Sequence, residues 1–266
     1  MKASLYILVF TLYAYLATAQ SSIGPADAGM GGTYTLSTGV WPALANPAGL
    51  YTVEQLSAGA QHVNLYGLAG LSGQTLVIAG SLKKNRFGLH TQHFGNSRYR
   101  YTQTGFSFSR PLYPAWHAGI RLLLYRLHVP EYGIMTLPAA EAGFRYRIRN
   151  KQHIAFQVAN PNASGKETAL RELMPVRISL GYGAEVSEQV DFRFQAEKAN
   201  GTPFHLRSGF SYRMYRQLEI RAGMSLPDPR LSFGIGIYFR KFRIDTASTY
   251  HGLLGHHTQI ALSYGL

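Results

Sequence analysis

Residues 140–149 read AEAGFRYRIR, and this stretch decides the fold. Every second residue of it is small or apolar, and the residues between them are glycine, glutamate or arginine. Because successive side chains of a β-strand point to opposite faces, the alternation predicts a strand with one apolar and one polar face. A short turn follows at 150–151, and the apolar alternation resumes at Ile154, Phe156 and Val158, which predicts a hairpin.

The same two-residue period recurs from about residue 56 onward, in segments separated by glycine, proline, asparagine and charged residues. Segments of this length and period, bounded by turn-forming residues, are typical of antiparallel strands. The pattern predicts fourteen strands, of which the first four are weakly patterned. The predicted strands lie near residues 56–66, 71–82, 87–95, 98–109, 116–128, 139–149, 153–159, 175–183, 190–197, 204–212, 218–225, 231–239, 242–250 and 257–266.

Charged residues in the last nine predicted strands all lie opposite the apolar face. We interpret them as charge ladders, which are rows of basic and acidic side chains on neighbouring strands that stiffen a barrel wall. In such a ladder Arg145 or Arg147 would lie near acids of neighbouring strands. The alternative is an anion-preferring lumen, because arginines outnumber acids in this set. The set comprises Arg145, Arg147, Arg149, Arg177, Arg193, Arg207, Arg221, Arg243, Glu141, Asp191, Glu197, Glu219 and Asp245.

Two observations favour a barrel whose apolar face points outward into a membrane. About eight strands suffice to close a filled barrel, so fourteen strands with an apolar interior would enclose a large empty cavity. Aromatic residues also gather at one end of the apolar face, as the girdle of an outer-membrane barrel requires. They are Trp116, Tyr182, Tyr212, Phe239, Phe242 and Tyr264. The sequence therefore predicts an all-β, antiparallel, up-and-down transmembrane barrel of about fourteen strands in the bacterial outer membrane.

The first nineteen residues have the features of a secretory signal peptide. A basic start at Lys2 precedes the apolar run Leu5 to Leu16, and the small residues Ala17 and Ala19 suit signal peptidase. The run is short for a membrane anchor, which is the alternative. We therefore expect residues 1–19 to be a signal peptide, residues 20–55 to form an N-terminal segment without strands, and residues 56–266 to form the barrel.

Composition argues against several classes of protein. The 266 residues include no cysteine, which excludes disulfide scaffolds, cysteine-ligated metal sites and thiol nucleophiles. The net charge is +13, but the basic residues are spread along the chain, so we expect no nucleic-acid partner. No motif selects a Ser–His pair, and the adjacent His256 and His257 in an expected outer loop are weak evidence for metal binding. We therefore expect neither an enzyme nor a cofactor.

Two motifs stand in the N-terminal segment. Residues 24–32 read GPADAGMGG, and residues 46–50 read NPAGL. A phosphate-binding loop is disfavoured, because no strand precedes the glycines and no helix with Lys-Ser/Thr follows. Followed by a β-rich chain, the two motifs resemble the PorV/PorQ family of the Bacteroidetes type, within the FadL-like (OmpP1/FadL/TodX) superfamily of outer-membrane proteins. The matching positions are Gly29, Met30, Gly31, Gly32, Asn46, Pro47, Ala48 and Gly49.

The resemblance implies a fourteen-stranded barrel whose N-terminal segment folds into the lumen as a plug. It also implies an accessory component of a secretion complex of type IX kind, or of an outer-membrane assembly complex, with protein partners. The alternative is a FadL-like transporter of small hydrophobic compounds. The longest outer connections are expected at Val129–Pro138 and Asn160–Met174, and the polar character of the second disfavours a long-chain fatty-acid site.

The predicted periplasmic turns are rich in basic residues. Lys83, Lys84, Arg240 and Lys241 belong to this periplasmic basic rim. Two partners suit it equally well. One is the set of lipid headgroups of the inner leaflet, and the other is an acidic periplasmic protein.

Overall fold

The computed structural model describes residues 23–130, 133–149, 151–161 and 174–265. The predicted signal peptide lies outside these residues, as does most of the expected outer connection Asn160–Met174. None of the helices in the described residues is long and apolar enough to cross a membrane.

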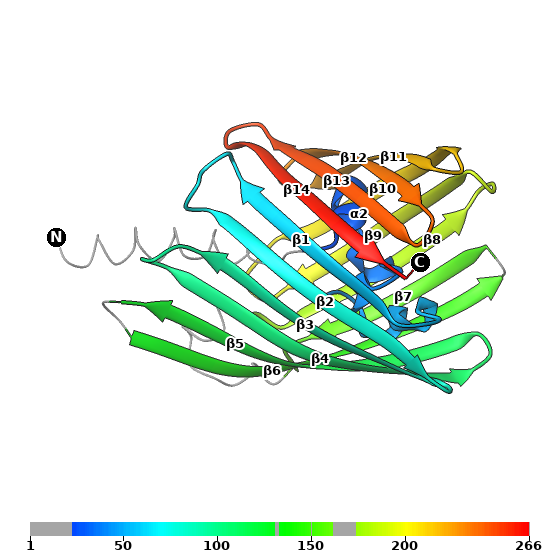
Figure 1. Cartoon of the computed structure of the whole chain (residues 1–266), viewed down its shortest axis with the longest axis horizontal. Coiled ribbons are helices and arrows are strands. Elements are labelled where there is room, and N and C mark those ends of the chain that lie inside the picture. Colours follow the sequence, from blue (N-terminus) through cyan, green and yellow to red (C-terminus); the bar gives the residue numbers. More distant parts are fainter. Residues whose placement is uncertain (1–22, 131–132, 150, 162–173, 266) are drawn as a thin grey trace.

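Fourteen strands form one closed antiparallel barrel, in which each strand pairs with its neighbours in sequence and β1 pairs with β14 (Figure 1). This confirms the predicted fold and strand number. The strands are β1 (Ser57–Leu65), β2 (Ser72–Leu82), β3 (Asn85–Gly95), β4 (Arg100–Tyr113), β5 (Trp116–Val129), β6 (Gly133–Arg149), β7 (Gln152–Ala159), β8 (Arg177–Glu185), β9 (Val190–Ala199), β10 (Phe204–Tyr215), β11 (Leu218–Leu226), β12 (Arg230–Phe239), β13 (Phe242–His251) and β14 (Gly255–Tyr264).

One predicted loop is wrong. The expected outer connection Val129–Pro138 is mostly strand, because β5 runs to Val129 and β6 begins at Gly133, and these two residues pair directly. The alternation of apolar and polar residues is weak here, so the period gave no signal. Pairing across a tight hairpin satisfies the backbone groups that a loop would leave to solvent.

Large apolar side chains lie on the outside of the barrel. Phe233 is 60% exposed, whereas its neighbour Ser232 is 2% exposed and faces inward. Aromatic residues mark the end of the barrel at which β1 begins: Trp116 packs against Tyr146, and Phe242 packs against Tyr264. An apolar exterior with an aromatic rim is the expected surface of an outer-membrane barrel.

The N-terminal segment lies inside the barrel (Figure 1). It consists of the helix α2 (Pro25–Gly29) and three short 3₁₀ helices, η1 (Tyr34–Leu36), η2 (Trp41–Ala43) and η3 (Pro47–Thr52). Helix α2 packs against β11 to β14, η1 against β7 and β8, and η3 against β3 to β6. Val40, Trp41 and Leu50 of this segment form an apolar core with Val77, Ala79 and Ala261 of the wall.

Candidate functional site in the plugged lumen

We use the name plug for residues 24–53, which occupy the lumen in the described structure. Two of its glycines, Gly29 and Gly31, lie where the backbone of the plug meets the backbone of the wall. Gly31 has φ +71°, and a Cβ there would lie 2.5 Å from the Ser208 carbonyl oxygen. A Cβ at Gly29 would lie 3.0 Å from the Cα of Gly234. Gly32 has ordinary space around it but a φ of +82°, so its backbone conformation favours glycine.

Wall glycines make room for the same contacts. A Cβ at Gly209 or Gly223 would lie closer than 3.0 Å to the backbone of Met30, and one at Gly119 equally close to Pro47. Sequence reasoning missed these positions, which fall on the polar face of the strands. The glycines themselves could have predicted these contacts, since an isolated glycine within a strand often marks a close approach of another backbone segment.

Asn46 fastens the middle of the plug. Its side-chain oxygen accepts a hydrogen bond from the Ala48 amide (3.1 Å), which caps η3. Its amide nitrogen donates to the carbonyl oxygens of Thr35 (3.1 Å) and of Phe156 in β7 (3.3 Å). Pro47 begins η3, and Ala48 and Gly49 are buried. The NPAGL motif therefore ties two parts of the plug to one strand of the wall.

Arginines of the wall donate to the plug. Arg145 donates to the carbonyl oxygens of Ser37 (3.0 Å) and Leu36 (3.3 Å). Arg207 donates to that of Gly32 (3.1 Å), and Arg193 forms an ion pair with Asp27 (3.1 Å). Burial raises the pKa of Asp27 although Arg193 opposes the shift.

Tyr34 connects η1 to the wall. Burial raises the pKa of Tyr34 to about 12, so its hydroxyl stays protonated and donates to Glu197. The same hydroxyl lies 3.0 Å from the Ser179 hydroxyl, which joins β8 to this contact.

The predicted charge ladders are present for some members of the set. Arg221 bridges Glu219 (2.8 Å) and Asp245 (2.7 Å), and Arg193 also pairs with Asp191 (2.8 Å). The expected pairing of Arg145 or Arg147 with an acid does not occur in the described residues. Arg145 is turned to the plug instead, because the plug supplies buried carbonyl groups. Arg147 is exposed and donates to the Pro114 carbonyl oxygen (3.2 Å).

Two small apolar clusters lie inside the outer half of the barrel, and the sequence did not predict them. Val63, Leu65 and Phe94 form one buried cluster, against which Tyr66, Leu71, Tyr99 and Tyr101 pack. Leu123, Ala139 and Met174 form another, with Tyr125 and Leu137. The buried strand residues among them occupy inward positions of β1, β3, β5 and β6. The weak pattern of the first strands follows from apolar residues on both of their faces.

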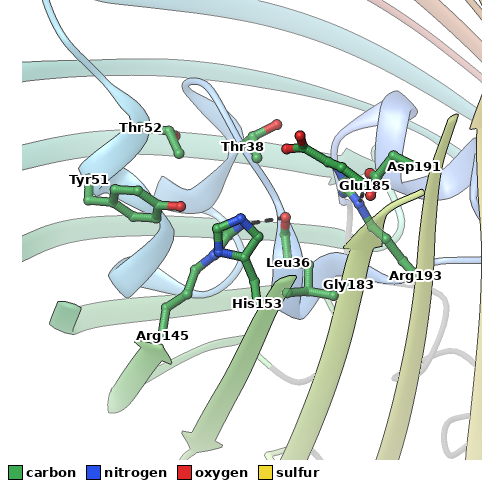
Figure 2. A pocket seen from close by; sticks show the side chains of 10 residues that line it. All are labelled: Leu36, Thr38, Tyr51, Thr52, Arg145, His153, Gly183, Glu185, Asp191 and Arg193. Carbon is green, nitrogen blue, oxygen red and sulfur yellow. Dashed lines mark hydrogen bonds and ion pairs between the residues drawn. The ribbon is translucent and has the colours of Figure 1, made fainter. Parts of the chain in front are cut away.

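A small polar cavity lies at the other end of the plug, between the plug and β6 to β9 (Figure 2). Its volume is about 150 Å³. Tyr51 and Thr52 border it from the plug, and Arg145, His153 and Asp191 border it from the wall. The Tyr51 ring stacks on the His117 ring at 3.9 Å, and the Arg145 guanidinium lies 5.2 Å from the Tyr51 ring centre.

The periplasmic basic rim lies apart from the lumen. Lys83, Lys84, Arg240 and Lys241 are exposed at the barrel end that carries the aromatic rim. His256 and His257 belong to β14 and not to a loop, and they point to opposite faces. His256 lies 3.1 Å from the Ser248 hydroxyl, and His257 lies 3.2 Å from the Gln259 amide nitrogen.

No family model matches the chain, and no curated protein matches it. Similar solved structures include the Pseudomonas putida toluene transporter TodX, with a TM-score of 0.66 and 14% identity over 91% of this chain and 97% of that chain. The CymD monoaromatic hydrocarbon channel has a TM-score of 0.67 and 13% identity, over 92% and 98%. A Pseudomonas aeruginosa FadL homologue has a TM-score of 0.66 and 13% identity, over 91% and 98%.

Two of these similar proteins are named as a hydrocarbon channel and a toluene transporter. Identities of 13–14% show a shared fold and leave the PorV/PorQ resemblance without support from the comparisons. Together with the closed barrel and its apolar exterior, they place the chain in the bacterial outer membrane, in contact with its lipid. The chain has the plugged fourteen-stranded fold of FadL/TodX-type outer-membrane channels.

Proposed function

We propose that the chain carries small hydrophobic compounds across the outer membrane through the barrel lumen. The observation that carries this proposal is the pair of apolar clusters inside the outer half of the barrel, formed around Val63, Phe94 and Leu123. The interior of a water-filled porin is polar. Apolar inward side chains favour a solute that leaves water on entry, because burial of apolar surface is favourable.

The similar structures support this proposal over a role in secretion. Their names specify a toluene transporter and a monoaromatic hydrocarbon channel. The alternative that follows from the FadL-like resemblance is therefore the better supported of the two functions considered above.

A compound that passes these clusters reaches the plug next. The small cavity on the far side is similar in volume to an engineered cavity of ~150 Å³ that binds benzene. Its lining is polar, however, with Arg145, His153 and Asp191 around it. We infer that it is the periplasmic end of the path, and not a storage site.

Uptake of toluene into cells, with and without the chain, tests the proposal. Val63→Thr replaces an apolar group of these clusters by an isosteric hydroxyl, and we expect slower uptake. Thr249→Val is the matched control, because Thr249 is an inward residue of β13, two strands from β1, and belongs to neither apolar cluster. Toluene uptake that is the same with and without the chain would contradict the proposal, and so would equal uptake rates for the two variants.

A second candidate is the accessory role in a secretion or assembly complex that the PorV/PorQ resemblance implies. The periplasmic basic rim favours it, because Lys83, Lys84, Arg240 and Lys241 are exposed and form no ion pair in the described residues. Copurification of a defined acidic partner from native membranes, lost when the rim is neutralised, would support this role.

A further inference from the structure

The outward face of the barrel differs between opposite sides. On β8 and β9 it carries the large apolar residues Ile178, Leu180, Phe192 and Phe194. On β13, β14 and β1 to β3 it carries apolar residues such as Ile78, Ile244 and Leu262 nearer the aromatic rim. Farther from the rim the outward positions include a group of polar residues, which we call the polar wall: His62, Gln74, Thr91, Thr246, Ser248 and Thr258. In the closed strand order, β1 and β8 are seven strands apart, so the two surfaces lie on opposite sides of the barrel.

The polar wall lies at a depth where lipid tails are expected. Thr258 is six residues along β14 from the rim residue Tyr264, and Ser248 is six residues along β13 from Phe242. A rise of ~3.3 Å per residue and a strand tilt of ~40° place both about 15 Å from the aromatic rim. The apolar band of such barrels is ~25 Å tall. These side chains therefore face the hydrocarbon layer.

The polar positions are contiguous across strands. Ser248 pairs with Thr258, and His62 pairs with Gln74, in direct register. In the described part of the chain, the side chains of His62, Gln74 and Thr258 form no hydrogen bond, and lipid tails offer none. Polar side chains in a bilayer are commonly satisfied by groups of a neighbouring transmembrane element.

We propose that the polar wall is the interface of a homodimer in the outer membrane. Its hydroxyl, amide and imidazole groups both donate and accept hydrogen bonds, and no formally charged side chain is among them. Such a surface is complementary to itself, as a two-fold interface requires. Ala58 and Ala60 of β1 add small outward side chains at its centre, which allow two walls to approach closely.

The shape of this surface is also self-complementary, because it has a groove on one side of β1 and protruding side chains on the other. A groove of about 770 Å³ crosses the outside of β10 to β14, with Phe233, Ile235 and Ile260 among its walls. On the other side of β1, Leu76 and Leu89 protrude and are 59% and 57% exposed. A two-fold axis along the bilayer normal at β1 and β14 sets the protruding leucines of one copy over the groove of the other.

The absence of native cysteine makes a crosslinking test direct. Thr258→Cys places a single thiol near the proposed axis, and Leu180→Cys places one on β8 as the matched control. We expect oxidation in native membranes to convert most of the Thr258→Cys chain to a dimer of twice its mass, and the Leu180→Cys chain to remain monomeric. The test is independent of the transport proposal.

A second variant separates interface loss from misfolding. Thr258→Trp suits lipid but blocks close approach, so we expect a heat-modifiable barrel that is monomeric in nanodiscs, where the natural chain has the mass of a dimer. Four results would overturn the proposal: a Thr258→Cys chain that stays monomeric, equal crosslinking from Leu180→Cys, crosslinking to a protein of another mass, or dimers that persist in Thr258→Trp.

Discussion

Gly31 of the plug meets Gly223 of β11 inside the barrel, where a Cβ on Gly223 would lie 2.2 Å from the Gly31 amide nitrogen. The contact joins segments that are separated by most of the sequence. Because backbone lies against backbone here, this contact cannot adapt to an added side chain as a contact between flexible side chains could. Substitutions at this contact therefore report directly on how firmly the plug is held.

Gly31→Ala should destabilise the folded chain by about 2–5 kcal/mol. The left-handed backbone costs an alanine ~1–2 kcal/mol, and overpacking against Ser208 and Met224 adds ~1–3 kcal/mol. Gly201→Ala is the matched control, because Gly201 has φ +77° but no atom near its Cβ position. Denaturant unfolding in detergent measures both. If the two variants lose the same stability, the close contact at Gly31 has no energetic role.

Asn46→Ala removes the cap of η3 and leaves the carbonyl groups of Thr35 and Phe156 without their amide partner. We expect a loss of about 1–3 kcal/mol in the free energy of unfolding, because buried polar groups lose their hydrogen bonds. Asn64→Ala is the control, since the Asn64 amide donates only to the Leu68 carbonyl oxygen at an exposed site. Comparable unfolding curves for the two variants would mean that Asn46 does not fasten the plug.

Phe233→Arg tests which face of the wall meets lipid. Arginine at a lipid-facing position near the bilayer midplane costs ~2–4 kcal/mol. We expect the variant to lose heat-modifiable barrel in membranes. Thr249→Arg, on the inward face of the neighbouring strand β13, should be tolerated better because it is only half-buried. Folded yields are read by gel mobility before and after heating. The orientation is wrong if Thr249→Arg is as harmful as Phe233→Arg.

Much of this architecture follows from the sequence, and the parts that do not have physical reasons. The two-residue alternation of apolar and polar side chains located the strands of the C-terminal half, where residues such as Phe192 and Ile235 alternate with polar or small residues. It gave weak signals in the early strands, where Val63 and Phe94 place apolar groups in the lumen as well. The role of Gly223 was not predictable from its own strand, because its partner is a plug residue that no local pattern connects to it.

The resemblance of the N-terminal motifs predicted a plug, but not how it is held. Arg145 was expected to pair with an acid of a neighbouring strand, and it binds plug carbonyl groups instead. A register argument relates strands to one another and carries no information about a chain segment inside the barrel. The polar side chain of Asn46, in contrast, stood in a motif before a proline, where a helix cap is a recurring structure.

Neutralising Lys83, Lys84, Arg240 and Lys241 together should leave the barrel heat-modifiable, because exposed charges contribute little to folding. If an acidic periplasmic protein binds there, binding should weaken in the variant and in added salt alike, since screening acts over ~10 Å at 0.1 M. Affinity at low and high salt measures both effects. Salt-insensitive binding that survives the fourfold change would exclude the rim as a docking surface.

The most direct test of the plugged lumen is single-channel conductance in planar bilayers. The intact chain is expected to show no porin-like conductance, because the plug occupies the lumen. A chain that lacks residues 24–50 should conduct with large, steady openings, since fourteen strands enclose a wide interior. Porin-like conductance of the intact chain, or identical traces from the intact and shortened chains, would contradict the account.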